Sequence, residues 1–326
     1  TKRIEELDEN VRAREVHDGL TWYDVRDWGV EGQGWPDTAA TYTRLPKRAE
    51  NLVRPPVWDL SLHAAGLCTR FATDSKTISG RWQLRFDQLA MDHMPATGVS
   101  GIDLYCRDQT GAWHWQGIGR AGGFTDACCQ IAGDLKGKDR EYLLYFPLYN
   151  GVEKVEIGVD ADASFSGIKP RRDKPVVFYG TSITQGACAS RPGMAYPSIL
   201  GRWLDRPVIN LGFSGNGKMD GEIAELLTEL DAEVDFIDCL PNMTDDLVTE
   251  RTEPFVRTIR ADCPATPIIL AEDRTSPAAR SSTAVARQQR SRRAALRAEF
   301  DKLAQAGVPH LYYVGGQGQM GLDGEG

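Results

Sequence analysis

The segment Lys169-Pro-Arg-Arg-Asp-Lys-Pro-Val-Val-Phe-Tyr-Gly-Thr-Ser-Ile-Thr-Gln-Gly186 divides the chain into two parts with different sequence patterns. It begins as a basic, proline-flanked linker, and the run 176–180 that follows is short and apolar, as in a buried parallel strand. Strands that alternate with helices indicate a doubly wound α/β domain. We therefore expect a flavodoxin-like sheet of five parallel strands over residues 173–326. The other strand-like runs are 208–211, 234–240, 267–271 and 310–314, and helical patterns lie at 223–230 and from about 286 to 303.

The residues before this linker follow a different rhythm. Polar and apolar residues alternate with period two in the segments 79–86, 101–106 and 154–159, and turn residues separate these segments. This pattern predicts an antiparallel, jelly-roll-like β-sandwich over residues 1–172, with one short helix near residues 4–15. Seven of the eight tryptophans lie before residue 120, which supports the division. We expect the earliest of them to pack in a core or domain interface rather than to stack on sugar rings. These are Trp22, Trp28 and Trp35.

Composition excludes several classes of protein. Lysine and arginine number 38 against 46 aspartate and glutamate, so the net charge of −8 argues against a nucleic-acid binder. No run approaches the roughly 18 apolar residues of a membrane helix, so we expect no membrane insertion. The seven cysteines form no CxxC pair, and we predict no metal site and no cofactor. The sequence leaves the oligomeric state and the compartment open. For a soluble protein of this kind, an extracytoplasmic location is slightly favoured over a cytoplasmic one.

Two segments match the glycine spacing of a dinucleotide-binding loop. They are 117–122 and 316–321, and neither is followed by a helix whose N-terminus could hold a pyrophosphate. The loop 180–186 lacks the Lys-Ser/Thr ending of a phosphate-binding loop. The sequence therefore predicts no nucleotide site.

The chemistry is expected at the carboxyl ends of the parallel strands, where ligands bind in open α/β sheets. Ser182 follows the first strand, the glycine-rich loop 212–217 follows the second, and Asn242 follows the third. A serine exposed in a tight turn can attack a carbonyl carbon, and backbone amides in glycine loops can approach the resulting oxyanion. An asparagine side chain can add a further N–H donor. This arrangement predicts acyl transfer through Ser182.

These residues also resemble a known family. Gly-Thr-Ser182-Ile-Thr-Gln-Gly is similar to the first block of the SGNH/GDSL hydrolases, with Thr181 where the common pattern has aspartate. Asn210-Leu-Gly-Phe-Ser-Gly215 resembles the second block, and Asn242 the third. Gly101-Ile-Asp-Leu-Tyr105 resembles the GxDLY signature of the β-domain that precedes the hydrolase domain in one bacterial subgroup. The resemblance implies Ser182 as nucleophile, with the amides of Ser182 and Gly215 and the side chain of Asn242 as oxyanion donors.

The family's remaining block, Asp-x-x-His after the fifth strand, has no match in residues 1–326. His310 precedes its strand, so it lies at the opposite edge of the sheet from Ser182. We therefore expect the general-base histidine and its partner aspartate beyond Gly326.

The resemblance favours a serine esterase that removes a small acyl group, such as acetyl, from a carbohydrate-like or other small-molecule ester. A lipid or lysophospholipid acylhydrolase, an acyltransferase and a non-catalytic carbohydrate-binding protein with a decayed hydrolase domain remain alternatives. His93 and Glu272 are candidate substrate-binding residues. For His93 the alternative is a surface or structural histidine, and for Glu272 it is an ion-pair network with Asp273 and Arg274. The arginine-rich run 287–297 is expected to be the solvated face of a long helix.

Overall fold

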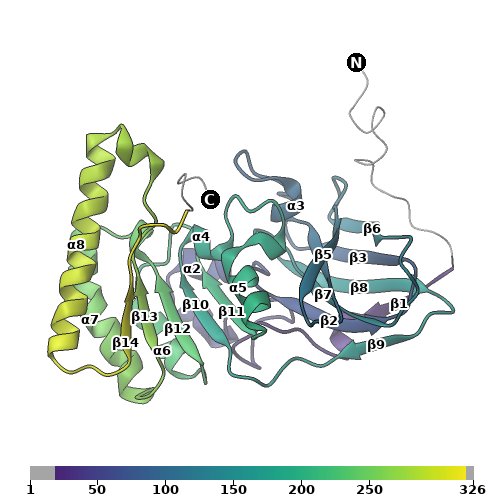
Figure 1. Ribbon diagram of the computed structural model, residues 1–326, viewed down its shortest axis with the longest axis horizontal. Coiled ribbons are helices and arrows are strands. Elements are labelled where there is room, and N and C mark those ends of the chain that lie inside the picture. Colours follow the sequence, from purple (N-terminus) through teal and green to yellow (C-terminus); the bar gives the residue numbers. More distant parts are fainter. Residues whose placement is uncertain (1–18, 321–326) are drawn as a thin grey trace.

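The computed structural model describes residues 19–320, and the helix expected near residues 4–15 lies outside this range. The described chain contains two antiparallel sheets and one parallel sheet. Figure 1 shows the antiparallel strands β1–β9 at one end of the molecule and the parallel strands β10–β14 with their helices at the other. The predicted fold class is confirmed. The domain boundary at residues 172 and 173 stays a prediction.

The β-domain, formed by strands β1–β9, is a sandwich of two sheets. Aromatic and β-branched side chains from both sheets meet in one core, which includes Phe71, Trp82, Leu144 and Ile157. The first sheet has the order β1 (Leu20–Asp24), β8 (Val152–Asp160), β3 (Ile78–Leu84) and β6 (Asp126–Ala132). The second has the order β5 (Trp113–Gly119), β4 (Ile102–Arg107), β7 (Arg140–Tyr145), β2 (Cys68–Thr73) and β9 (Phe165–Ile168), and the short helix α3 (Ala96–Val99) precedes β4.

The α/β domain contains the parallel sheet. Its first strand in sequence, β10 (Val176–Gly180), is buried along its whole length and pairs with strands on both sides. Because the sheet order changes direction next to β10, the carboxyl end of this strand is the topological switch point where a ligand site is expected. The sheet has the order β11 (Val208–Gly212), β10, β12 (Val234–Asp238), β13 (Ile268–Ala271) and β14 (Leu311–Val314).

Helices cover both faces of this sheet (Figure 1). One face packs in a large apolar core against α6 (Gly221–Thr228), α7 (Asp245–Asp262) and α8 (Thr283–Gln305). On the other face, Tyr196 of α5 (Tyr196–Leu204) packs its ring against Phe178 and Phe236. The remaining short elements are α2 (Pro55–Ser61), α4 (Ser182–Gln185), η2 (Val25–Asp27), η3 (Lys47–Asn51), η4 (Pro192–Met194), η5 (Leu240–Asn242) and η6 (Pro277–Arg280).

A segment from the start of the chain is built into the α/β core. Trp35, Leu45, Val53 and Val57 are buried in the same apolar cluster as the helices α6–α8. The indole Nε1 of Trp35 also donates to Glu229 Oε2 at 2.8 Å. The segment 35–57 therefore contributes to the domain that carries the parallel sheet, although it precedes most of the β-domain in sequence.

Two further observations concern surfaces and cysteines. Tyr312 and Val314 on the edge strand β14 are 52% and 37% exposed, so the outer face of this strand is open in the described chain. All seven cysteines are free thiols. Between residues 19 and 320, no helix is long and apolar enough to cross a membrane.

Candidate active site

Ser182 lies at the carboxyl end of β10, the first strand of the parallel sheet in sequence, as predicted. Strand β10 ends at Gly180, and Ser182 is the first residue of the single-turn helix α4. Thr181 caps this helix, since its side chain accepts from the amide of Ile183 at 3.4 Å. Ser182 is therefore not the capping residue, and its half-exposed side chain makes no hydrogen bond within the described residues. The threonine that replaces the family's common aspartate thus has a local structural role.

The glycine-rich loop 212–217 packs directly against this turn. A Cβ atom at Gly212 would lie 2.1 Å from the backbone nitrogen of Gln185, and one at Gly217 would lie 2.0 Å from the carbonyl oxygen of Gly180. Only glycine fits at both positions. Gly215, at the exposed tip of the loop, has a φ of +70°. In the described chain, neither the amide of Ser182 nor that of Gly215 donates a hydrogen bond to the protein. Both N–H groups are therefore free to bind a ligand.

Asn242 joins the same edge of the sheet from η5, which follows β12. Its side-chain oxygen accepts from the backbone amides of Asn216 at 3.1 Å and of Gly217 at 3.3 Å. This orientation leaves the side-chain Nδ2 as the free donor. The structure thus brings together the loops that carry Ser182, Gly215 and Asn242. Their three unused N–H donors lie at the carboxyl-terminal edge of the parallel sheet.

A buried arginine that sequence reasoning missed supports the glycine-rich loop. The guanidinium of Arg44 donates to the carbonyl oxygens of Asn210 at 3.0 Å and Gly212 at 2.8 Å. It also donates to the carbonyls of Leu60 at 2.5 Å and His63 at 3.0 Å. No carboxylate pairs with it in the described residues, and burial lowers its pKa to about 9. Arg44 therefore acts as a hydrogen-bonding brace between the N-terminal segment and the end of β11.

We expect the change Arg44→Met to destabilise the protein by at least about 3 kcal/mol, because buried carbonyl groups would lose their donors. Urea unfolding followed by circular dichroism measures this change. The control is Arg48→Met, because Arg48 is exposed and pairs with Asp37 and Glu229 at the surface, where an ion pair contributes at most about 1 kcal/mol. Equal unfolding midpoints for the two variants would show that Arg44 is no brace.

The β-domain also reaches this site. The hydroxyl of Tyr149 donates to the carbonyl oxygen of Ser182 at 3.2 Å. The side-chain nitrogen of Gln185 bonds to His63 Nδ1 at 3.0 Å, while its oxygen accepts from the amide of Ser214 at 3.0 Å. Burial, with the nearby charges of Arg44 and Arg85, lowers the pKa of His63 to about 3. His63 is therefore a neutral hydrogen-bonding partner that helps to hold the loop.

A buried carboxyl group contacts helix α4, which begins with Ser182. Asp238, at the end of β12, accepts from the hydroxyls of Thr184 at 3.1 Å and Tyr196 at 3.2 Å. Burial raises the pKa of Asp238 to about 6, although both hydrogen bonds favour its ionised form. These bonds connect helices α4 and α5 to the strand that precedes Asn242.

The structure places the two candidate substrate-binding residues differently. Glu272 accepts from the hydroxyl of Tyr313 at 2.7 Å and from the amide of Gly316 at 2.8 Å, and it pairs with Arg293 at 3.4 Å. Its carboxylate is therefore occupied in holding the segment after β14. His93 is exposed in the loop before α3 and has no hydrogen-bond partner in the described chain.

Two expectations about charged residues need correction. The neighbouring Asp273 is buried and pairs with Arg292 and Arg293 at 3.0 Å, not with Arg274. These two arginines belong to the run 287–297, so one side of that run turns inward instead of facing solvent. Arg287, Arg290 and Arg297 are exposed as expected.

No histidine between residues 19 and 320 hydrogen-bonds to the Ser182 hydroxyl. His310 precedes β14 and lies at the opposite edge of the sheet, as predicted. Within the same range, no three or more histidine, cysteine, aspartate or glutamate side chains are arranged to hold a metal ion.

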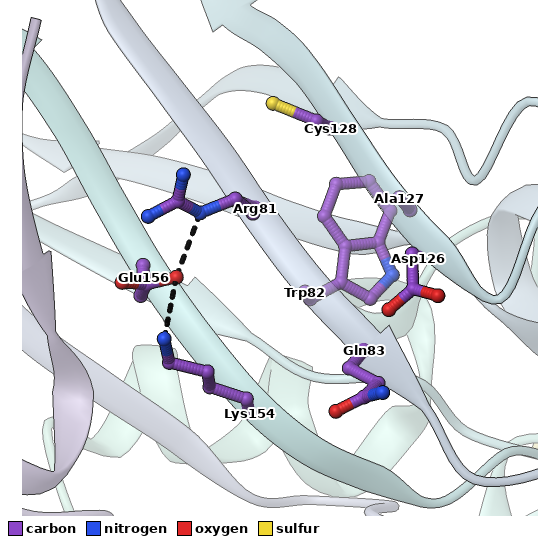
Figure 2. A pocket seen from close by; sticks show the side chains of 8 residues that line it. All are labelled: Arg81, Trp82, Gln83, Asp126, Ala127, Cys128, Lys154 and Glu156. Carbon is purple, nitrogen blue, oxygen red and sulfur yellow. Dashed lines mark hydrogen bonds and ion pairs between the residues drawn. The ribbon is translucent and has the colours of Figure 1, made fainter.

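A separate hollow of about 270 Å³ lies on the outer face of the first antiparallel sheet, over strands β3, β6 and β8. Figure 2 shows that Arg81 and Lys154 both pair with Glu156 across this hollow. Its charged groups thus largely neutralise one another, and no residue of the Ser182 site lines it. The complete lining is Arg81, Trp82, Gln83, Asp126, Ala127, Cys128, Lys154 and Glu156.

Comparisons with known proteins agree with this geometry. Residues 173–326 match the GDSL-like lipase/acylhydrolase family, and residues 20–165 match the GxDLY N-terminal region of SGNH-hydrolase-type esterases. No curated relative matches the sequence.

Several solved structures share the fold. A protein of Bacteroides ovatus ATCC 8483 assigned as a GDSL-like lipase is 32% identical, with a TM-score of 0.89 over 94% of this chain and 90% of its own. The salicylyl-acyltransferase of a tetracycline biosynthetic pathway is 19% identical, with a TM-score of 0.72 over 92% of this chain and 86% of its own. A family two carbohydrate esterase from Clostridium thermocellum, solved with cellohexaose, is 12% identical, with a TM-score of 0.51 over 79% and 85% of the two chains. The strand-end serine, the glycine loop that packs against it and the match along nearly the whole chain agree: this protein belongs to the GDSL-like lipase/acylhydrolase family of SGNH-type esterases and is a carboxylic ester hydrolase.

Proposed function

We propose that this enzyme removes a small acyl group, most simply acetyl, from a carbohydrate-like ester through an acyl-enzyme on Ser182. The proposal rests on the unused N–H donors at the carboxyl-terminal edge of the parallel sheet. They are the amides of Ser182 and Gly215 and the side-chain Nδ2 of Asn242. Such donors stabilise the negative charge that develops on the carbonyl oxygen during acyl transfer.

In the proposed reaction, a general base takes the proton of the Ser182 hydroxyl as its oxygen attacks the ester carbonyl carbon. The three donors hold the tetrahedral oxyanion until the alcohol leaves with a proton returned by the base. Water then attacks the acyl-enzyme in the same way and releases the acid. The family resemblance implies a histidine as this base and an aspartate as its partner, and both are part of the proposal.

Solved structures with the same fold support the substrate class. The carbohydrate esterase from Clostridium thermocellum shares the two-domain fold, and its structure holds cellohexaose. The salicylyl-acyltransferase shares the fold as well, so a transferase that passes the acyl group to an alcohol instead of water is the second candidate. The two reactions differ only in what attacks the acyl-enzyme.

A panel of esters tests the proposed substrate. With the full-length protein, we expect kcat/KM for an acetylated sugar to exceed that for the octanoyl ester of the same sugar by at least about tenfold, since each methylene contributes roughly 1–3 kcal/mol to discrimination. Acid release measured at constant pH reports hydrolysis, and added acceptor sugar with product mass analysis reports transfer. A preference for octanoyl esters or for lysophospholipid would contradict the acetyl assignment. Acyl transfer to the acceptor faster than to water would favour the transferase.

A further inference from the structure

The loop 187–194, which follows the nucleophile helix, is attached to Ser182 at its start. The carbonyl oxygen of Ser182 accepts from the amides of Gly186 at 2.9 Å and of Ala187 at 2.8 Å. A displacement of the loop would therefore also move the turn that carries Ser182. Met194 is the last residue of the loop, and its side chain is exposed. Helix α5 begins two residues later, at Tyr196.

The far half of this loop is held by the β-domain. The hydroxyl of Thr97 donates to the carbonyl oxygen of Ser190 at 2.5 Å. The carboxylate of Asp103 accepts from the amide of Gly193 at 2.8 Å and pairs with Arg191 at 3.4 Å. Within the loop itself, only short turn hydrogen bonds are formed, such as Met194 to Arg191.

Asp103 is completely buried and uses both of its carboxylate oxygens. Oδ2 binds the loop, while Oδ1 accepts from the indole Nε1 of Trp115 at 2.9 Å. The guanidinium of Arg191 lies over the Trp115 ring, 4.8 Å from its centroid. A buried carboxylate is expensive to desolvate, so an apolar residue would serve simple packing better. Its hydrogen bonds instead specify one position for the loop.

The two surfaces also fit too closely to allow even one added methyl group. A Cβ atom at Gly193 would lie 2.3 Å from the Tyr105 ring, and one at Gly98 would lie 2.2 Å from the carbonyl oxygen of Ala189. The other side of the interface extends the same contact, because Arg202 of α5 lies over the Tyr105 ring at 3.9 Å. Asp103 and Tyr105 are the aspartate and tyrosine of the GxDLY signature.

We propose that Asp103 and Tyr105 are positioning residues that dock the loop 187–194, and that the GxDLY signature thereby sets the rim of the ester site. The proposal takes Ser182 as the reacting residue and in this respect rests on the proposed function. In this proposal the β-domain affects substrate binding through the position of the loop 187–194, without contacting the reacting atoms.

The test is the variant Asp103→Asn, which keeps the side-chain shape but places an amide group opposite one of the donors. Hydrogen exchange followed by mass spectrometry measures the loop directly. We expect peptides that cover 187–194 to exchange at least about tenfold faster, because a charge-assisted hydrogen bond to Gly193 is weakened. For an acetylated sugar we expect KM to rise about tenfold while kcat changes less than about threefold, since the rim contacts substrate and transition state alike.

The matched control is Asp108→Asn. Asp108 follows β4, the strand that carries Asp103, but its carboxylate binds only Thr110 and Ala112 of the following turn and His114 of β5. It should leave both loop exchange and KM unchanged. If Asp103→Asn does not fold, Thr97→Val removes the hydrogen bond to Ser190 and should raise loop exchange in the same peptides.

Unchanged exchange and unchanged KM in a folded Asp103→Asn protein would overturn the proposal. A uniform loss of kcat with unchanged loop exchange would do so as well. The exchange measurement does not depend on the identity of the nucleophile. If Ser182 proves not to react, the loop docking is still tested, and the two failures can be told apart.

Discussion

Replacing Ser182 with alanine should lower kcat/KM for p-nitrophenyl acetate by about 10⁴-fold or more in the full-length protein, because removal of the nucleophile leaves only the oxyanion donors and substrate binding. The stability of the fold should stay nearly unchanged. The Ser182 hydroxyl makes no hydrogen bond in the described chain, and Thr181 caps α4 in its place. We therefore expect the free energy of unfolding to change by less than about 0.5 kcal/mol.

Initial rates of p-nitrophenol release and urea unfolding together check this expectation. Ser166→Ala is the matched control, because Ser166 is exposed on β9 and its side chain makes no hydrogen bond in the described chain. Ser166→Ala should keep the full rate. A Ser182→Ala protein with more than a tenth of the normal rate would show that another residue attacks the ester.

The second large effect is expected at Asn242. We expect Asn242→Ala to lower kcat by about 10²–10³-fold with little change in KM, as for the loss of one oxyanion donor. The side-chain oxygen of Asn242 also anchors the amides of Asn216 and Gly217, so alanine removes two functions at once. The variant Asn242→Asp separates them, since its carboxylate still accepts from both amides but offers no N–H to the oxyanion.

Steady-state kinetics on both variants decides between the two functions. If Nδ2 stabilises the oxyanion, aspartate should be as inactive as alanine. Activity restored by aspartate would mean that Asn242 only anchors the loop. Asn51→Ala, at an exposed position in η3, serves as the control and should behave like the unmodified enzyme.

The sequence was informative wherever function depends on position along a strand. The apolar run that became β10 placed Ser182 at a sheet edge, and the parallel arrangement brings the ends of β11 and β12 to the same edge. The parallel sheet and the site candidates Ser182, Gly215 and Asn242 could therefore be argued from local patterns, whereas the order of strands within the sheet was not predicted. Their catalytic roles remain proposals until the variants are measured.

Partners distant in sequence could not be argued in this way. Arg44 lies 166 and 168 residues from the two strand carbonyls that it binds in β11. The residues next to Arg44 in sequence do not distinguish it from a surface arginine. The same reason explains why Arg292 and Arg293, rather than the adjacent Arg274, pair with Asp273. Helical periodicity shows that the run 287–297 is amphipathic, but it does not show that a buried carboxylate faces part of it.

The segment 35–57 has a consequence for how the protein is made. Trp35 and its hydrogen-bond partner Glu229 are separated by 194 residues. At translation rates of about 5–20 residues per second, the indole leaves the ribosome on the order of 10–40 s before its partner exists. During that time these apolar side chains have no native core to enter, and exposed apolar segments of this kind are prone to aggregation. Maturation of the enzyme thus depends on the order of synthesis: the segment 35–57 waits for the helices α6–α8 before it can be buried.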